Sequence, residues 1–255
     1  MGKSKVIDLS VTMANNPPGS FIQSEIMYYS HEEGAKARGK SLNLPEGFFP
    51  ENRFAAEEVT KVSTHAGTHL DAPWHYGPTS EGKPAKPIDE IPLEWCYGDG
   101  VVLDFSYKKA GELISAQDVQ KALVKISYKL KPLDIVLIRT DASKHYGEPG
   151  YENTHPGMGR ESTLWLIEQG IKVMGIDAFG WDRPFGVMLR ECQSGAKGVF
   201  WAGHFVGKEK EYCHLENLAN LDLIPVPYGF KVAVFPIKIK RASAGWVRAV
   251  AIVDE

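Results

Sequence analysis

The chain has 255 residues, 43% of them hydrophobic, and 29 lysines and arginines against 32 aspartates and glutamates give a net charge of -3. This composition is ordinary for a globular protein and includes no run of five like charges, which argues against a nucleic-acid or membrane-surface partner. We therefore expect a small-molecule substrate.

The first half of the chain carries short strand signals that lead toward a helix. Apolar residues predict a strand at residues 6–10, and an alternating pattern predicts another at 58–63. A third strand is predicted at residues 101–105. The helix that follows should start at Ser115, with Asp118 three residues later as the acidic partner of a capping box.

The middle of the chain continues this strand–helix–strand pattern. Residues 134–139 read as a buried strand, and residues 161–169 form an amphipathic helical pattern that ends at Gly170. The next strand is predicted at residues 172–176. Alternation of this kind indicates an α/β fold.

The end of the chain is β-rich, with two long strands predicted at residues 230–240 and 246–253. Two other segments, 17–50 and 181–202, are predicted to be long loops, of the kind that forms lids or binding sites in compact domains. No linker is apparent. We therefore predict a single mixed-sheet domain over residues 1–255.

The lack of a recognisable targeting signal and the pattern of cysteines predict a cytoplasmic protein. The opening MGKSKVIDLSVTM lacks the apolar run of a secretory signal, and no apolar run approaches the ~20 residues of a membrane span. The cysteines form an odd set without a C-x-x-C pair, which disfavours a disulfide framework: Cys96, Cys192 and Cys213. A metal site would have to use histidine and carboxylate.

Three histidines and an aspartate fall within 11 residues, in S-T-H-A-G-T-H-L-D-A-P-W-H-Y. Imidazole and carboxylate suit zinc, manganese or iron. His65 and His69 are four residues apart, so one helical turn would place them on one face, and Asp71 follows two residues later. Gly67 lets the backbone pass close to an ion. The alternative is a surface coincidence, but we favour metal ligands.

His75 follows Pro73, which we expect to stop any helix and turn the chain. A neutral imidazole beside a metal site can move protons near pH 7. We therefore predict that His75 is a general acid/base and not a ligand.

A second group of candidates lies in G-H-F-V-G-K-E-K-E-Y-C-H-L-E-N-L. By themselves, His204 could be a core histidine and Glu216 a solvated residue. His214 competes with both as a ligand, since it lies only two residues from Glu216.

Aromatic side chains are candidates for the wall of a substrate pocket, although core packing explains most aromatic residues. Trp74 is favoured because it lies between Asp71 and His75. The candidates are Trp74, Phe48, Phe49, Phe179, Trp181 and Trp201.

The stretch H-A-G-T-H-L-D-A-P-W-H resembles the H-x-G-T-H-x-D-x-P-x-H signature of the cyclase-like metal-dependent hydrolases, which include bacterial kynurenine formamidase and isatin hydrolase. The segments I-D-L-S, I-D-E-I-P-L, I-R-T, G-I-D and L-E-N also match in order. The resemblance thus covers most of the chain and implies a swivelling β/β/α fold, usually as a homodimer or larger oligomer.

The resemblance also implies a metal centre. In the formamidase branch, two zinc ions would share Asp71, one held with His65 and His69 and the other with His204 and Glu216. In the isatin hydrolase branch, a single manganese ion would use the two signature histidines and the aspartate. His75 matches the position of the proposed catalytic histidine.

Three functions remain open. The first is hydrolysis of a small amide, N-formyl amide, or cyclic amide or imide by a metal-activated water. The second is a lactone hydrolase or cyclase with the same site, and the third is a metal-binding protein without turnover. Neither a G-x-S-x-G elbow nor a G-x-G-x-x-G motif is present, which disfavours serine catalysis and dinucleotide binding.

Overall fold

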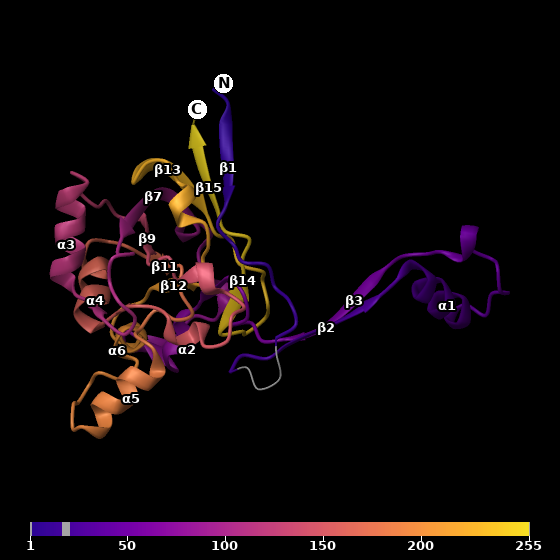
Figure 1. Cartoon of the computed structure of the whole chain (residues 1–255), viewed down its shortest axis with the longest axis horizontal. Helices are drawn as coiled ribbons and strands as arrows, with labels where there is room; N and C mark the ends of the chain where they lie inside the picture. Colours follow the sequence, from indigo (N-terminus) through magenta and orange to yellow (C-terminus); the bar gives the residue numbers. More distant parts are fainter. Residues whose placement is uncertain (1, 17–20, 255) are drawn as a thin grey trace. The chain divides into compact units, whose positions relative to one another are not determined.

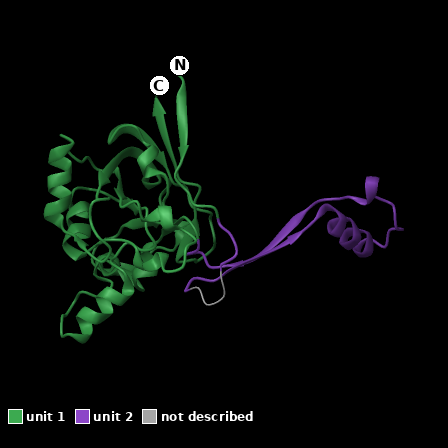
Figure 2. Cartoon of the chain, in the orientation of Figure 1, with its two compact units in different colours: residues 1–12, 67–255 green, residues 13–66 purple. Residues whose placement is uncertain are grey.

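A computed structural model describes residues 2–16 and 21–254. Their contacts divide the chain into two compact units: unit 1 contains the described residues of 1–12 and 67–255, and unit 2 those of 13–66 (Figure 2). The single domain proposed from the sequence remains a prediction. Each unit is described by itself.

Unit 1 is built on a mixed sheet of nine strands, as far as the described residues go (Figure 1). Strands β7, β9, β11 and β12 are parallel, whereas β4 is antiparallel to both of its neighbours. Strand β1 pairs with β15, which brings the two ends of the chain together. In spatial order the strands are β1 (Ser4–Asp8), β15 (Val250–Asp254), β13 (Tyr228–Ala233), β7 (Tyr97–Asp104), β9 (Ile135–Arg139), β11 (Val173–Ile176), β12 (Cys213–Glu216), β4 (His69–Asp71) and β14 (Ala244–Trp246).

The central strands are connected by the two predicted helices. Helix α3 (Ala116–Lys125) links β7 to β9, and α4 (Arg160–Glu168) links β9 to β11. The predicted capping box is present: the Ser115 hydroxyl accepts from the Asp118 amide, and the Asp118 carboxylate accepts from the Ser115 amide. The α/β prediction is confirmed, because parallel strands need such crossovers.

Each central strand has one face toward the helices and one toward a second core. Val136 and Ile138 of β9 pack with α3 and α4, whereas Ile135 and Leu137 point the other way. Strand β12 follows the same rule, because Cys213 and Leu215 lie in the second core. Its polar residues therefore face the helical side of the sheet.

The two long strands predicted at residues 230–240 and 246–253 are wrong. Strand β13 ends at Ala233, and Pro236, which lacks an amide hydrogen, follows in an irregular stretch. Residues 244–254 form two strands, β14 against β4 and β15 against β13 and β1. The break lies where the Val247 amide bonds to the Thr68 carbonyl and the Ala249 amide to the Ser10 hydroxyl.

The two predicted long loops contain regular structure. Residues 17–20 lie outside the described residues, but 21–50 include β2 (Ser24–Tyr29), which pairs with β3 (Glu57–Val62), and α1 (His31–Ser41). A capping box of Ser30 and Glu33 starts α1. The 181–202 segment contains α5 (Phe185–Gln193), which buries Met188.

Unit 2 consists of the β2–β3 hairpin, α1 and a small aromatic cluster. The ring of Phe49 lies 5.4 Å from that of Phe48 and 4.7 Å from that of Phe54. Gly34 lets α1 approach the Ala55 carbonyl, where an added Cβ would lie only 2.0 Å from the oxygen. Phe48 is 57% exposed.

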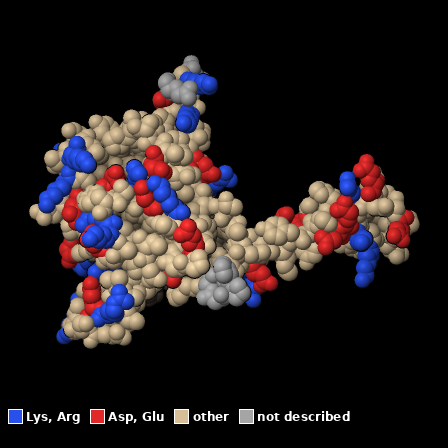
Figure 3. All heavy atoms as spheres, in the orientation of Figure 1, with Lys and Arg blue, Asp and Glu red and all other residues tan. Residues whose placement is uncertain are grey.

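The remaining α-helices and strands of unit 1 are short. They are α2 (Pro73–Tyr76), α6 (Ala202–Phe205) and two small ladders, β5 (Thr79–Ser80) with β6 (Lys83–Pro84) and β8 (Leu113–Ile114) with β10 (Gly157–Met158). Across the described part of the chain, every helix is too short or too polar to traverse a bilayer. Basic and acidic side chains are interspersed over the unit 1 surface in the view of Figure 3.

Candidate metal centre

Strands β4 and β12 place four chemically active side chains on one face of the sheet. In their antiparallel register, Asp71 lies opposite His214 and His69 lies opposite Glu216. Residues two apart on a strand share a face, so His69 joins Asp71 and His214 joins Glu216. Directly opposed residues have Cβ atoms about 4.5–5.5 Å apart. Strand pairing alone therefore assembles a cluster.

The cluster is buried. Asp71 and His214 are completely inaccessible, His69 is 1% exposed and Glu216 is 8% exposed. A buried carboxylate is costly without a compensating charge. Among the residues that the structure describes, the cationic partners of Glu216 are all histidines, with no lysine or arginine.

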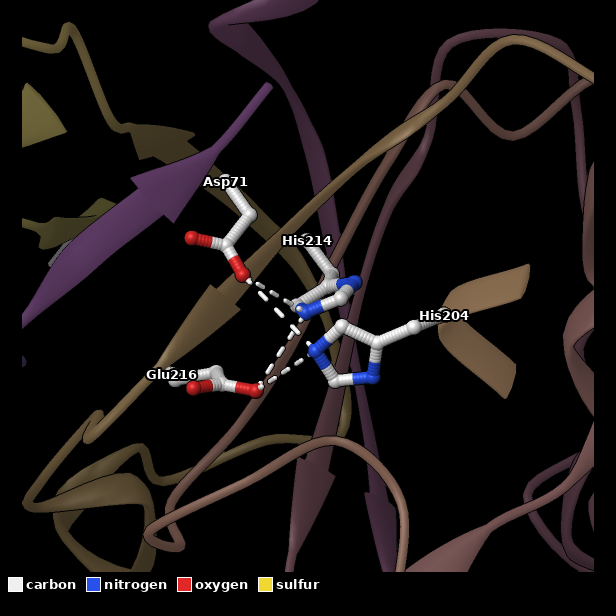
Figure 4. A group of neighbouring side chains, drawn as sticks. All are labelled: Asp71, His204, His214 and Glu216. Carbon is white, nitrogen blue, oxygen red and sulfur yellow. Dashed lines mark ion pairs between the residues drawn. The ribbon is translucent and has the colours of Figure 1, made fainter. Parts of the chain in front are cut away.

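Each carboxylate divides its oxygens between two sides of the cluster (Figure 4). On one side, His69 Nε2 lies 3.3 Å from Asp71 Oδ1 and 3.6 Å from Glu216 Oε2. On the other side, Asp71 Oδ2 lies 3.2 Å from His214 Nε2 and 3.9 Å from His204 Nε2. Glu216 Oε1 lies 3.3 Å and 3.4 Å from the same two nitrogens.

Helix α6 brings His204 to this group, and Asp182 holds it there. The Asp182 carboxylate accepts from the backbone amides of Gly203 and His204, at 2.6 and 3.0 Å, and lies 2.6 Å from His204 Nδ1. Burial alone would lower the pKa of the His204 imidazole, but the carboxylates of Asp182 and Glu216 raise it to about 10.

The partners of Nδ1 in two histidines fix which nitrogen faces the cluster. His69 Nδ1 lies 2.9 Å from the Gly67 carbonyl oxygen, which can only accept, so Nδ1 carries the proton. The Asp182 carboxylate imposes the same orientation on His204. When these rings are neutral, both Nε2 lone pairs point at the carboxylates, as in metal-binding histidines.

His214 has the same arrangement with tyrosines as partners. Its Nδ1 lies 3.0 Å from the Tyr76 hydroxyl and 3.3 Å from that of Tyr212. Its Nε2 is buried and makes no hydrogen bond to any described residue. A buried nitrogen donor without a hydrogen bond, facing two carboxylate oxygens, fits a divalent cation.

Trp181 fixes the other end of β12. Its backbone amide donates to Glu216 Oε1 at 2.8 Å, its ring stacks on His214 at 5.4 Å, and its indole nitrogen donates to Thr163. Burial would raise the pKa of the Glu216 carboxyl, but His204 and His214 lower it below its ordinary value. Trp181 is completely buried, which agrees with core packing, the alternative given for the aromatic candidates.

The geometry expected for the histidine motif needs two corrections. His65 and His69 do not lie on one helical turn: His65 is in a turn, and His69 begins strand β4, where alternation places it on the same face as Asp71. Pro73 does not stop a helix but starts one, at the first position of α2, where its missing amide hydrogen costs nothing. Helix α2 carries His75, whose Nε2 lies 3.6 Å from Asp71 Oδ2.

Trp201 lies against two of these histidines. Its ring stacks on His204 with centroids 4.2 Å apart and meets His75 edge-on at 5.2 Å. Its φ of 54° is unusual for a bulky residue and indicates a conformation held by its surroundings. Trp74, also on α2, is 46% exposed.

Three other predicted site residues do not belong to the paired strands that build this cluster. His65 and Phe48 belong to unit 2, His65 two residues before unit 1 resumes at Gly67. Phe179 packs edge-on against Tyr151, 6.1 Å away, at the margin of the helical core. The functional roles of all predicted site residues remain predictions.

Sequence reasoning ranked His214 only as a competitor and did not single out Asp182. The alternation C-H-L-E places His214 on the face of Glu216, which would have raised its rank once residues 213–216 were read as a strand. Asp182 follows Trp181 in W-D-R-P, and nothing in that local pattern indicates that it orients a histidine.

A family model described as putative cyclase matches residues 7–183. The chain belongs to this cyclase family. The isatin hydrolase of Roseibium aggregatum is 26% identical over 203 residues, which cover 76% of this chain and 73% of the relative. The kynurenine formamidase of Bordetella petrii is 27% identical over 190 residues, which cover 74% of this chain and 77% of the relative.

Solved structures share the cyclase fold. Isatin hydrolase A from Ralstonia solanacearum has a TM-score of 0.75 and 24% identity, over 98% of this chain and 92% of that one. An isatin hydrolase bound to the product analogue thioisatinate also has a TM-score of 0.75, at 21% identity, over 99% of this chain and 93% of that one. The family resemblance and the predicted fold class are confirmed.

Proposed function

We propose that this cyclase-family protein is a metal-dependent hydrolase that cleaves the C–N bond of a small amide, N-formyl amide, or cyclic amide or imide. One observation carries the proposal: Asp71 and Glu216 each direct one oxygen toward His69 and the other toward His204 and His214. Two carboxylates that face two sides in this way can bridge a pair of cations.

The ligands of the first ion would be His65, His69 and Asp71, and those of the second Asp71, His204 and Glu216. Zinc and manganese suit this set of imidazole and carboxylate donors. A divalent ion supplies two things to hydrolysis: it lowers the pKa of a water toward ~7 and stabilises negative charge on a carbonyl oxygen.

His75 would move the protons. Its side chain is 21% exposed, so solvent can reach it, and it lies 3.6 Å from a carboxylate oxygen of Asp71. In this position it can accept a proton from the attacking water and return it to the leaving nitrogen. Trp201, in contact with the His75 ring, holds that ring from one side.

The substrate class follows from the aromatic surroundings and the relatives. Trp201 contacts the His75 ring and Trp74 precedes His75 in the sequence, and such rings suit an aryl amide or a fused-ring lactam. The named relatives are an isatin hydrolase and a kynurenine formamidase, both hydrolases. A lactone hydrolase or cyclase would use the same residues and is the alternative that substrate tests decide.

Elemental analysis of the purified protein, combined with hydrolysis assays, tests the proposal. We expect bound zinc or manganese, hydrolysis of an N-formyl aryl amine or isatin, loss of activity with EDTA and recovery when the ion is restored. The Asp71→Asn variant should lose the ions and at least ~10³-fold in kcat/KM, equivalent to several kcal/mol of transition-state stabilisation.

Asp8→Asn is the matched control, because Asp8 pairs with Arg248 on the surface. Circular dichroism should show that both variants are folded. Full activity in metal-free protein, or in folded Asp71→Asn, would disprove the metal-dependent mechanism. Turnover of lactones alone would establish the alternative substrate class.

A further inference from the structure

Four donor atoms surround a common centre on the inner side of the cluster. They are Asp71 Oδ2, His204 Nε2, His214 Nε2 and Glu216 Oε1, all within 4.8 Å of one another and all from buried residues (Figure 4). The four nitrogen–oxygen distances among them are 3.2, 3.3, 3.4 and 3.9 Å.

These distances are close to the edges of a metal tetrahedron. Zinc bonds to imidazole nitrogen and carboxylate oxygen are about 2.0–2.1 Å long, so a regular tetrahedron has edges of about 3.3–3.4 Å. Three of the four nitrogen–oxygen distances lie within about 0.2 Å of that value. A small movement of His204 toward Asp71 would bring the fourth distance into the same range.

The orientation of His214 supports coordination over hydrogen bonding. Its Nε2 lies 3.2 Å from Asp71 Oδ2 and 3.3 Å from Glu216 Oε1, and it is not aligned for a regular hydrogen bond with either oxygen. Hydrogen bonding needs the N–H to point at one oxygen, whereas ligands of an ion point at the space between them. The Tyr76 hydroxyl oxygen can accept a hydrogen bond from the His214 Nδ1–H, and in that tautomer Nε2 carries the lone pair.

We propose that His214 is a fourth protein ligand of the ion held by Asp71, His204 and Glu216, which makes that position coordinatively closed. The inference rests on the proposed function and extends it. Asp71 and Glu216 bring negative charge to a cation in this dry interior, and the two imidazoles would bind it as neutral ligands. Closed positions characterise ions that hold structure.

A competing arrangement would have His214 protonated and replacing the second ion between the two carboxylates. The chain would then hold one ion, and removing the imidazole would create space for another. The two arrangements make opposite predictions for a variant without His214, so that variant decides between them.

The experiment is cobalt titration of metal-free full-length protein, followed by visible absorption and elemental analysis, with His214→Gln compared with wild type. We expect wild type to bind two ions, one with the intense absorption of four-coordinate cobalt. His214→Gln should lose that absorption and bind the second ion at least ~100-fold more weakly, since even partners that only orient ligands contribute 10–100-fold. The first ion should bind as before.

His145→Gln is the matched control, because His145 is exposed and pairs only with the neighbouring Glu148 among the described residues. Tyr76→Phe is the second test, since it keeps the ring and removes the hydroxyl beside Nδ1; it should weaken the same ion ~10-fold. This variant decides the matter if His214→Gln does not fold.

Unchanged binding of both ions in these variants would overturn the proposal. One ion in wild type and two in His214→Gln would overturn it in favour of the protonated arrangement, while leaving the hydrolase proposal intact. Absence of any tightly bound ion from wild type would refute the metal centre itself.

Discussion

Asp71 lies between two regions of contrasting character. On the inner side, His214 is surrounded by the rings of Tyr76, Tyr212 and Trp181, and all four residues are at most 2% exposed. We call these four residues the floor. Beside the floor, His75, Trp74 and Trp201 are partly exposed, and His75 Nε2 lies 3.6 Å from Asp71 Oδ2; we call these three residues the rim.

We assign ion binding to the floor and proton exchange to the rim. In the floor, rigid rings and buried hydrogen bonds hold His214 in a single orientation, which favours tight coordination in a dry environment. In the rim, solvent and substrate can reach His75. Substitutions in the floor should therefore change ion affinity, whereas those in the rim should change turnover.

The largest effect is expected in the rim. His75→Ala should lower kcat by ~10²–10⁴-fold, the usual contribution of a general acid/base, without changing the ion content. Steady-state kinetics and elemental analysis of the same preparation measure both quantities. The exposed His145→Ala serves as control. Loss of ions from His75→Ala would mean that this histidine is a ligand and that rim and floor do not differ as described.

Asp177 is a buried carboxylate outside the metal centre, and it can be compared with the buried carboxylates of the centre. Asp177 accepts from the backbone amides of Thr140 and Asp141 and from the Thr140 hydroxyl. Burial raises the pKa of its carboxyl to about 6, although these hydrogen bonds act to lower it. The folded protein therefore holds this proton more tightly than the unfolded chain does.

The free energy of unfolding should consequently fall as the pH rises from about 4 to above 6, where Asp177 ionises in the folded state. Asp177→Asn removes this dependence. Between pH 4 and pH 7 the free energy of unfolding of the wild type should fall by roughly 3 kcal/mol relative to that of the variant, because the pKa of Asp177 is about two units higher in the folded state. Urea unfolding of metal-free protein at several pH values measures the difference, and a constant difference would contradict the assignment.

A smaller effect on metal affinity is expected at Asp182, which contacts the metal-ligand candidate His204. Asp182→Asn retains an oxygen that can accept from the amides of Gly203 and His204 but loses the charge beside His204 Nδ1. Partners of this kind contribute 10–100-fold to metal affinity. Competition with a chelator should show such a loss for one ion, and unchanged affinity would show that Asp182 only starts α6.

The sequence was most informative where one local rule determines the outcome. The capping box of Ser115 and Asp118 starts α3 as predicted, and the βαβ pattern gives the parallel centre of the sheet. The spacing of His69, Asp71 and His75 identified residues that the fold places near one another. These features depend on neighbours a few residues apart in the chain.

Features that depend on distant partners were missed. His214 joins the cluster through the register of β12 with β4, about 140 residues earlier in the chain, and only the pairing reveals which face it occupies. Asp182 reaches His204 from twenty-two positions away. The closing strands were merged because apolar alternation does not show that the chain changes partners between β14 and β15.

Anomalous diffraction from crystals grown with the ion found by elemental analysis is the most direct test of a metal centre shared by β4 and β12. The result we expect is two peaks bridged by the Asp71 carboxylate, the inner one bonded to His204, His214 and Glu216. A map with no peak within bonding distance of Asp71 would contradict the account.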